Sequence, residues 1–148
     1  MPQRTDAPTP VDLPQLAGDL RMTVAALVRR FRQDRTVPQP QLAVLGRLTR
    51  KGPQTTSQLA AYEHVRPQSM AHTVAEMESA GFVRREPDPT DGRQTLIVLT
   101  DSGVAEMEAF SRKGESWVSA AIEEKIPVGE REDLARAVEL LGRLVDED

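Results

Sequence analysis

The chain has 148 residues, of which 39% are hydrophobic and 28% are charged, with a formal net charge of −4. This length predicts one domain, and the absence of a long apolar run argues against a membrane span or a secretory leader. Because the chain has no cysteine, a reducing cytosol is the expected compartment. With no cysteine, two histidines and no G-x-G pair, the sequence excludes disulfides, thiolate metal sites and glycine-rich phosphate loops, so no metal or cofactor is expected.

Residues 1–12 are rich in proline and poor in large apolar side chains, which predicts a disordered tail. From Leu13 to Phe31, apolar residues recur at steps of three and four, as on one face of an amphipathic helix. Asp12 is suited to cap this helix. A second helix is predicted to follow and to end at the Gly52-Pro53 pair.

A short third helix is predicted to begin with a capping box, Thr55-x-x-Gln58, in which each side chain bonds the backbone of the other residue. After a turn over residues 62–66, Pro67 suits the first position of a fourth helix that ends at Gly81. Its predicted buried residues are Met70, Val74 and Met77. The opposite face carries Gln68, Ser69, His72 and Glu76.

Residues 82–86 and 95–99 favour strands, and the loop over 87–94 contains Asp91-Gly92, which predicts a hairpin turn with a glycine at positive φ. Thr100 is expected to cap a long helix up to about Ile126. Candidates for the buried stripe of that helix are Val104, Met107, Phe110, Trp117, Ala121 and Ile126. After a break at residues 127–129, a last helix places Leu134, Val138, Leu141 and Val145 on one face.

A short helix, a turn, a second helix and then a hairpin form a winged helix-turn-helix, in a fold that is mainly α with a small β-hairpin. A helix fits the major groove of DNA, and an extended loop can follow the backbone or enter the minor groove. Similar shapes also bind proteins, so the alternative is a winged-helix protein-interaction module without DNA binding, which the acidic net charge favours. Neither a nucleophile with an aligned base nor a metal cluster indicates an enzyme.

The winged segment resembles the MarR (multiple antibiotic resistance regulator) family. The resemblance is carried by Thr55–Ala60, by Val74–Arg85, by the wing motif Asp91-Gly92-Arg93, and by Leu99-Thr100-x-x-Gly103. It implies a cytoplasmic, homodimeric repressor that binds a pseudo-palindromic operator in double-stranded DNA and is released by a small aromatic or anionic effector. It also implies one domain over 13–148, with dimerisation helices at 13–37 and 101–148 around a winged helix-turn-helix at 38–100.

The residues expected to touch DNA lie on the fourth helix and the wing. Arginine is always charged and is attracted to a narrow minor groove, and glutamine can pair with adenine through two hydrogen bonds. The predicted DNA contacts are Arg93, Gln68, Ser69, His72, Arg66 and Arg84. Because side chains alternate along a strand, we expect at most one of Arg84 and Arg85 to face DNA and the other to pair with a carboxylate.

Two further groups of residues have predicted roles. Asp91 and Gly92 are expected to support the wing turn. By resemblance, an effector would bind among the first, second and fifth helices, near Met22, Leu45 and Phe110.

The net charge is distributed unevenly along the chain. Between Arg47 and Thr95, seven basic and six acidic residues give +1, and the rest of the chain carries −5. The acidic total therefore does not argue against DNA binding by the winged segment, but it predicts a modest affinity for nonspecific DNA.

Overall fold

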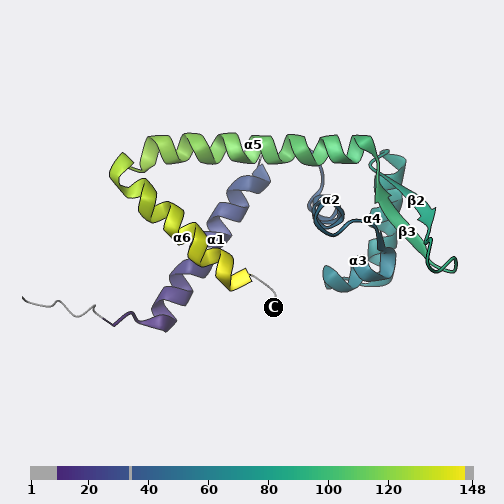
Figure 1. Ribbon diagram of the computed structural model, residues 1–148, viewed down its shortest axis with the longest axis horizontal. Coiled ribbons are helices and arrows are strands. Elements are labelled where there is room, and N and C mark those ends of the chain that lie inside the picture. Colours follow the sequence, from purple (N-terminus) through teal and green to yellow (C-terminus); the bar gives the residue numbers. More distant parts are fainter. Residues whose placement is uncertain (1–9, 34, 146–148) are drawn as a thin grey trace, which may run out of the picture. The chain divides into compact units, whose positions relative to one another are not determined.

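A computed structural model of the chain describes residues 10–33 and 35–145, and it divides the chain into two compact units, residues 1–35 and 36–148. Residues 1–9 of the predicted tail lie outside the described residues. The elements, in chain order, are α1 (Leu13–Gln33), α2 (Gln39–Lys51), β1 (Gln54–Thr55), α3 (Thr56–Tyr62), α4 (Pro67–Ser79), β2 (Val83–Pro87), β3 (Thr95–Leu99), α5 (Asp101–Lys125), the 3-10 turn η1 (Val128–Glu130) and α6 (Arg131–Val145) (Figure 1). This order confirms the winged helix-turn-helix and the mainly α fold.

The helix α1 makes up the described part of the first unit. Asp12 caps it as predicted, because its carboxylate accepts a hydrogen bond from the backbone N–H of Gln15 at 3.2 Å. Pro14 lies in the first turn, where the missing N–H breaks no helical hydrogen bond. None of the α1 residues is buried.

The hydrophobic core lies in the second unit, where α2, α3 and α4 pack with the sheet. The predicted inward residues of α4, which are Met70, Val74 and Met77, are at most 3% exposed. They meet Leu59 of α3 and Ile97 of β3 in one cluster of buried side chains. The apolar spacing of these short helices therefore predicted the core correctly.

The capping box at the start of α3 is confirmed. The Thr55 hydroxyl accepts from the Gln58 backbone N–H at 3.1 Å, and the Gln58 side-chain oxygen accepts from the Thr55 backbone N–H at 2.9 Å. The sequence did not predict that Gln54 and Thr55 also form a strand, β1, which pairs antiparallel with Ile97 and Leu96 of β3. The sheet order is β1-β3-β2, so the central strand of the wing is bonded on both sides.

The end of α4 and the start of α5 are joined through Thr100. Its hydroxyl donates to the carbonyl of Gly81 and accepts from the backbone N–H of Gly103 at 3.1 Å. Its own N–H donates to the carbonyl of Phe82 at 3.1 Å. A Cβ on Gly103 would lie 2.1 Å from that same carbonyl oxygen, so only glycine fits there. The Leu-Thr-x-x-Gly motif thus forms a tight junction between two helices.

The structure departs from two predictions about the second unit. First, α5 buries its apolar stripe only in part: Val104 is 42% exposed, and the other predicted residues are half-buried, namely Met107, Phe110, Trp117, Ala121 and Ile126. The helix packs against α2 and β3, but these cover only part of its length. Secondly, among the described residues Gly92 is not at positive φ. Seven residues separate β2 from β3, so Asp91-Gly92 is not the centre of a two-residue turn, where positive φ would be required.

Candidate nucleic-acid interface

The exposed face of α4 carries the predicted base-reading residues. Gln68, His72 and Glu76 are spaced four residues apart, which places them in one row along the helix, opposite its buried face, and all three are exposed. Ser69 is exposed beside this row. These side chains therefore lie where a helix entering the major groove presents its residues to the bases.

Arg66 occupies the N-cap position of α4 in an extended conformation, with φ −68° and ψ 144°, and forms no side-chain cap. An arginine side chain carries no hydrogen-bond acceptor, so it cannot cap the helix as a serine or threonine would. Arg66 is exposed at the start of α4, where the free N–H groups of the first turn favour anions. The local charge therefore suits a phosphate.

The wing loop is organised by the carboxylate of Asp88. It accepts hydrogen bonds from both the backbone N–H and the hydroxyl of Thr90, each at 2.8 Å. These bonds lower the pKa of Asp88 below its usual value of 3.8, because they favour the charged carboxylate. The loop is closed by a backbone hydrogen bond from Asp88 to the carbonyl of Gln94 at 3.0 Å.

Arg93 projects from this loop. The Asp91 carboxylate accepts from the Arg93 backbone N–H at 3.1 Å, so Asp91 lies within the turn, as its predicted supporting role requires. The Arg93 side chain is exposed, and among the residues that the structure describes its guanidinium has no acidic partner. A positive charge at the end of the wing is thus available to an external anion.

The two arginines of β2 are both paired, whereas only one was expected to be. Arg84 donates to the Glu86 carboxylate at 2.7 Å and to the carbonyl of Leu99 at 3.0 Å. Arg85 donates to the Glu78 carboxylate of α4 at 2.8 Å. The reason is that side chains two apart share one face of a strand, and α4 supplies an acid on the other.

Sequence reasoning missed two contacts that hold α2 against the helix-turn-helix. The Arg47 guanidinium lies 3.7 Å from the centre of the Tyr62 ring, in a cation–π contact, and its Nε atom is buried without a hydrogen-bond partner. The side chain of Gln41, 9% exposed, donates to the Glu76 carboxylate at 3.4 Å. Neither pair is linked by a spacing that a sequence pattern reveals.

The predicted effector residues lie in different environments. Leu45 is completely buried in the core, so it does not line an open cavity, and Phe110 is half-buried on α5. Met22 belongs to α1, in the other unit. A cavity of about 490 Å³ lies between α2 and α5, and its lining includes Leu48, Leu99, Val104, Met107 and Arg112.

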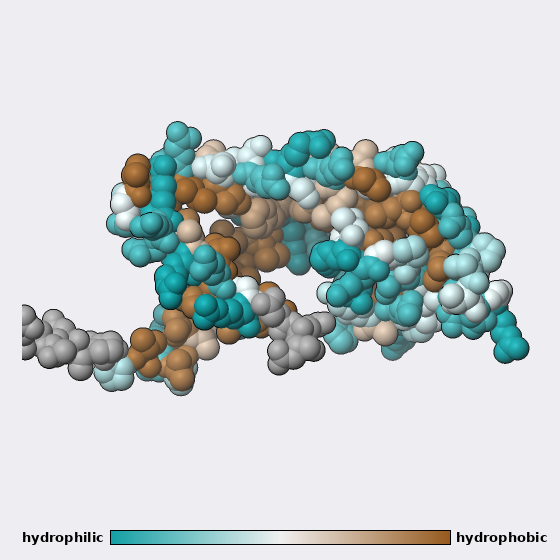
Figure 2. All heavy atoms as spheres, viewed as in Figure 1, coloured by the Kyte–Doolittle hydropathy of each residue, from teal (hydrophilic) through white to brown (hydrophobic). Residues whose placement is uncertain are grey.

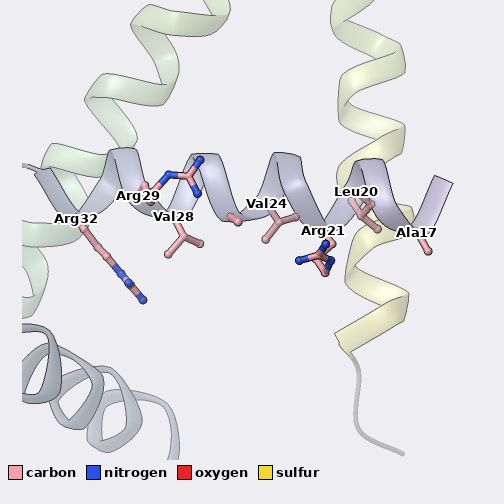
Figure 3. A pocket seen from close by; sticks show the side chains of 8 residues that line it. Ala17, Leu20, Arg21, Val24, Val28, Arg29 and Arg32 are labelled. Carbon is pink, nitrogen blue, oxygen red and sulfur yellow. The ribbon is translucent and has the colours of Figure 1, made fainter. Parts of the chain in front are cut away.

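Large apolar side chains on α1 and α6 are exposed. On α1 they include Leu13, Leu16, Met22, Val24, Leu27 and Val28; on α6 they are Val138, Leu140, Leu141, Leu144 and Val145. Figure 2 shows apolar residues, in brown, at the surface near the start of α1. In Figure 3, Val24, Val28 and Arg32 project to the same side of α1, where Arg21 and Arg29 also line a shallow depression. In the single chain these apolar faces are exposed to solvent, whereas large apolar side chains are usually buried.

The family follows from comparison with known proteins. The sequence model of the MarR family matches residues 37–95. An HTH-type transcriptional regulator of Mycobacterium leprae is 37% identical over 136 residues, which cover 90% of this chain and 94% of that protein. The chain belongs to the MarR family. It is therefore a transcriptional regulator with a DNA-binding winged helix-turn-helix.

Solved structures agree with this MarR-family assignment. A structure assigned to a transcriptional regulator of Pseudomonas aeruginosa is 32% identical, with a TM-score of 0.81 over 94% of this chain and 99% of that one. A variant of MepR from Staphylococcus aureus, solved with a bound oligodeoxyribonucleotide, is 20% identical, with a TM-score of 0.63 over 87% of this chain and 97% of that one. The second likeness shows a shared fold. No helix among the described residues is long and apolar enough to cross a membrane.

Proposed function

We propose that this MarR-family regulator is a homodimeric repressor that binds a pseudo-palindromic operator and is released by a small effector. The observation that carries the homodimer is the exposure of the apolar faces of α1 and α6 in the single chain. Leu144, for example, is 69% exposed and Leu16 is 51% exposed. A soluble chain usually covers such faces, and most homo-oligomers do so with a two-fold copy of the same surface.

The same exposed faces locate the proposed interface within the chain. Residues 13–37, which contain α1, and residues 101–148, which contain α5 and α6, are the dimerisation segments of this proposal, because α1 and α6 carry the exposed apolar side chains.

In the proposed complex, each α4 enters a major groove, and the two half-sites lie about one helical turn, ~10 bp, apart. Gln68, Ser69 and His72 contact base edges, and Arg66 contacts a phosphate. Arg93 enters the neighbouring minor groove. Arg84 reaches the backbone by exchanging its bond to Glu86 for one to a phosphate.

The proposed effector is a small aromatic or anionic molecule bound beside α5. The cavity between α2 and α5 has a volume typical of small-molecule sites and combines apolar side chains with Arg112. Because Thr100 joins α5 to the end of α4, a shift of α5 would move the reading helix. Binding that favours the shifted arrangement would release the operator.

Nuclease footprinting of the protein on the DNA upstream of its own gene tests this function. We expect a two-fold symmetric footprint that weakens as salt is raised, and a reporter behind that DNA that is more active when the regulator is deleted. Sedimentation of the free protein should give a dimer. Two outcomes would overturn the proposal in favour of a protein-interaction module. One is that the protein does not bind this DNA, and the other is binding that neither salt nor Arg93→Ala changes.

A further inference from the structure

The helix expected to read DNA has an unusual charge for that task. Over its 13 residues, Pro67–Ser79, α4 contains no lysine or arginine, and its charged residues are Glu76 and Glu78. Surfaces that bind DNA are usually basic, because they replace the counterions of the phosphates. Each carboxylate on α4 therefore lowers affinity for DNA in general, and its presence calls for an explanation.

Glu78 is accounted for by the fold. Its carboxylate accepts from the Arg85 guanidinium at 2.8 Å, and the two side chains are 44% and 41% exposed. The pair joins α4 to the first strand of the wing and neutralises both charges. Glu78 thus has a structural partner of opposite charge.

Glu76 is held differently. One carboxylate oxygen accepts from the side-chain N–H of Gln41, a buried residue of α2, at 3.4 Å. The other lies 3.4 Å from Nε2 of His72, and the Glu76 side chain is 52% exposed. No lysine or arginine among the described residues forms an ion pair with it. The Glu76 carboxylate is therefore held in place by Gln41 and His72, and its oxygens remain available at the surface to accept a further hydrogen bond.

Glu76 belongs to the row of exposed α4 residues, and about half of its side chain is open to solvent. Glu76 follows Gln68 and His72 at intervals of four residues, so the three lie along one line of the helix. A carboxylate only accepts hydrogen bonds, and in the major groove the amino group at N4 of cytosine donates one. Guanine and thymine present acceptors at the corresponding positions, and adenine carries the acceptor N7 beside its amino group, so each of these bases repels a carboxylate that cytosine does not.

We propose that Glu76 is a specificity-determining residue, which selects cytosine at one position of each operator half-site. The proposal rests on the proposed function, in which α4 enters the major groove. The negative charge of Glu76 lowers the affinity for every DNA sequence. A hydrogen bond from the cytosine amino group offsets this loss only at sequences that place a cytosine beside Glu76. Discrimination then comes from a cost on wrong sequences as well as from a contact to the right one.

Selection from a randomised DNA duplex library with the full chain tests this assignment. We compare the wild type with Glu76→Gln and Glu76→Ala. Glutamine pairs with adenine through two hydrogen bonds, so Glu76→Gln should change the preference at one symmetric pair of positions from cytosine to adenine. Glu76→Ala should lose about 5- to 150-fold of discrimination at that pair, while its affinity for unrelated DNA rises.

The matched control is Glu78→Gln, which removes the same charge from the same helix two residues away but keeps a side-chain oxygen that can accept from Arg85, so the link between α4 and the wing is retained. It should raise affinity for all sequences without changing any base preference. If Glu76→Gln and Glu76→Ala select the same bases as the wild type, the assignment is overturned while the proposed function stands. A wild-type chain that enriches no sequence overturns both.

Discussion

The hydroxyl of Thr100 donates a hydrogen bond to the carbonyl of Gly81, two residues beyond the end of α4, and the same hydroxyl caps α5 through the N–H of Gly103. One side chain therefore bonds both the backbone that follows α4 and the first turn of α5. Gly81 has φ +80°, a left-handed conformation that turns the chain from α4 toward β2 and brings its carbonyl to Thr100. The position of α4 relative to α5 depends on this contact.

Thr100→Val should lower the free energy of unfolding by about 1–2 kcal/mol, because α5 loses its cap and the Gly81 carbonyl loses its donor. Thr100→Ser keeps the hydroxyl and should restore most of the difference. Urea denaturation of the three proteins measures it. Equal stability of the valine and serine variants would contradict the role of the hydroxyl.

Gly103→Ala should destabilise the chain by about 1–3 kcal/mol, since the added methyl group would lie 2.1 Å from the Phe82 carbonyl oxygen. Gly92→Ala is the matched control: nothing lies within 4 Å of its added Cβ, and Gly92 is not at positive φ. Thermal unfolding should show a clear loss for the first variant and little change for the second.

Arg93→Ala should weaken binding to many DNA sequences rather than alter one base preference, because the arginine is expected to contact the minor groove through charge. The slope of log K against log salt should decrease by about one per protomer. Lys113→Ala removes the same charge from the middle of α5 and serves as the control. A change confined to one base pair would contradict the assignment of the wing.

Asp88 should stay ionised to lower pH than an ordinary aspartate, since its bonds to Thr90 lower its pKa. The sign follows from linkage: its contribution to wing order is complete above the usual value of 3.8 and is lost as pH falls through the lower pKa of the folded chain. A carboxyl titration followed by NMR measures this pKa. Asp88→Asn retains an acceptor and should keep the wing ordered, whereas Asp88→Ala should increase amide exchange at Thr90.

Leu141→Glu should dissociate the proposed dimer, because it places a charge in the apolar face of α6. We expect the free energy of association to weaken by at least about 2 kcal/mol, which raises the dimer Kd roughly 30-fold. Sedimentation velocity detects a change of this size. Ala135→Glu adds the same charge to α6 away from the line of Leu134, Val138 and Leu141. A dimer that survives Leu141→Glu would exclude this face from the interface.

Local patterns predicted the helices and their caps well, because the residues that decide them are close in sequence. The capping box at Thr55 and the buried row of Met70, Val74 and Met77 depend on spacings of three and four residues. The pairing of Gln54 with Ile97 in the sheet could not be predicted in the same way. A two-residue strand carries too little alternation to be recognised without its partner.

The candidate site shows the same division. Exposure of Gln68 and Arg93 followed from the helical period and from the position of the wing loop. The bond from Arg84 to the carbonyl of Leu99, and the contact between Gln41 and Glu76, depend on how separate elements pack. Burial of Leu45 likewise follows from the way α2 packs into the core. The helical period shows which residues face inward, but it does not show whether they meet the core or line a cavity.

Strand β3 lies at the centre of the sheet and holds the wing in place relative to α4. It is bonded to β2 along the wing and to β1 at the start of α3, while Arg85 and Glu78 join the wing to α4. These bonds hold α4 and the wing at a fixed separation. In the proposed complex, DNA must bring a major groove to α4 and a minor groove to the wing at that separation, so the twist and groove width of the DNA would contribute to recognition at base pairs that no side chain touches.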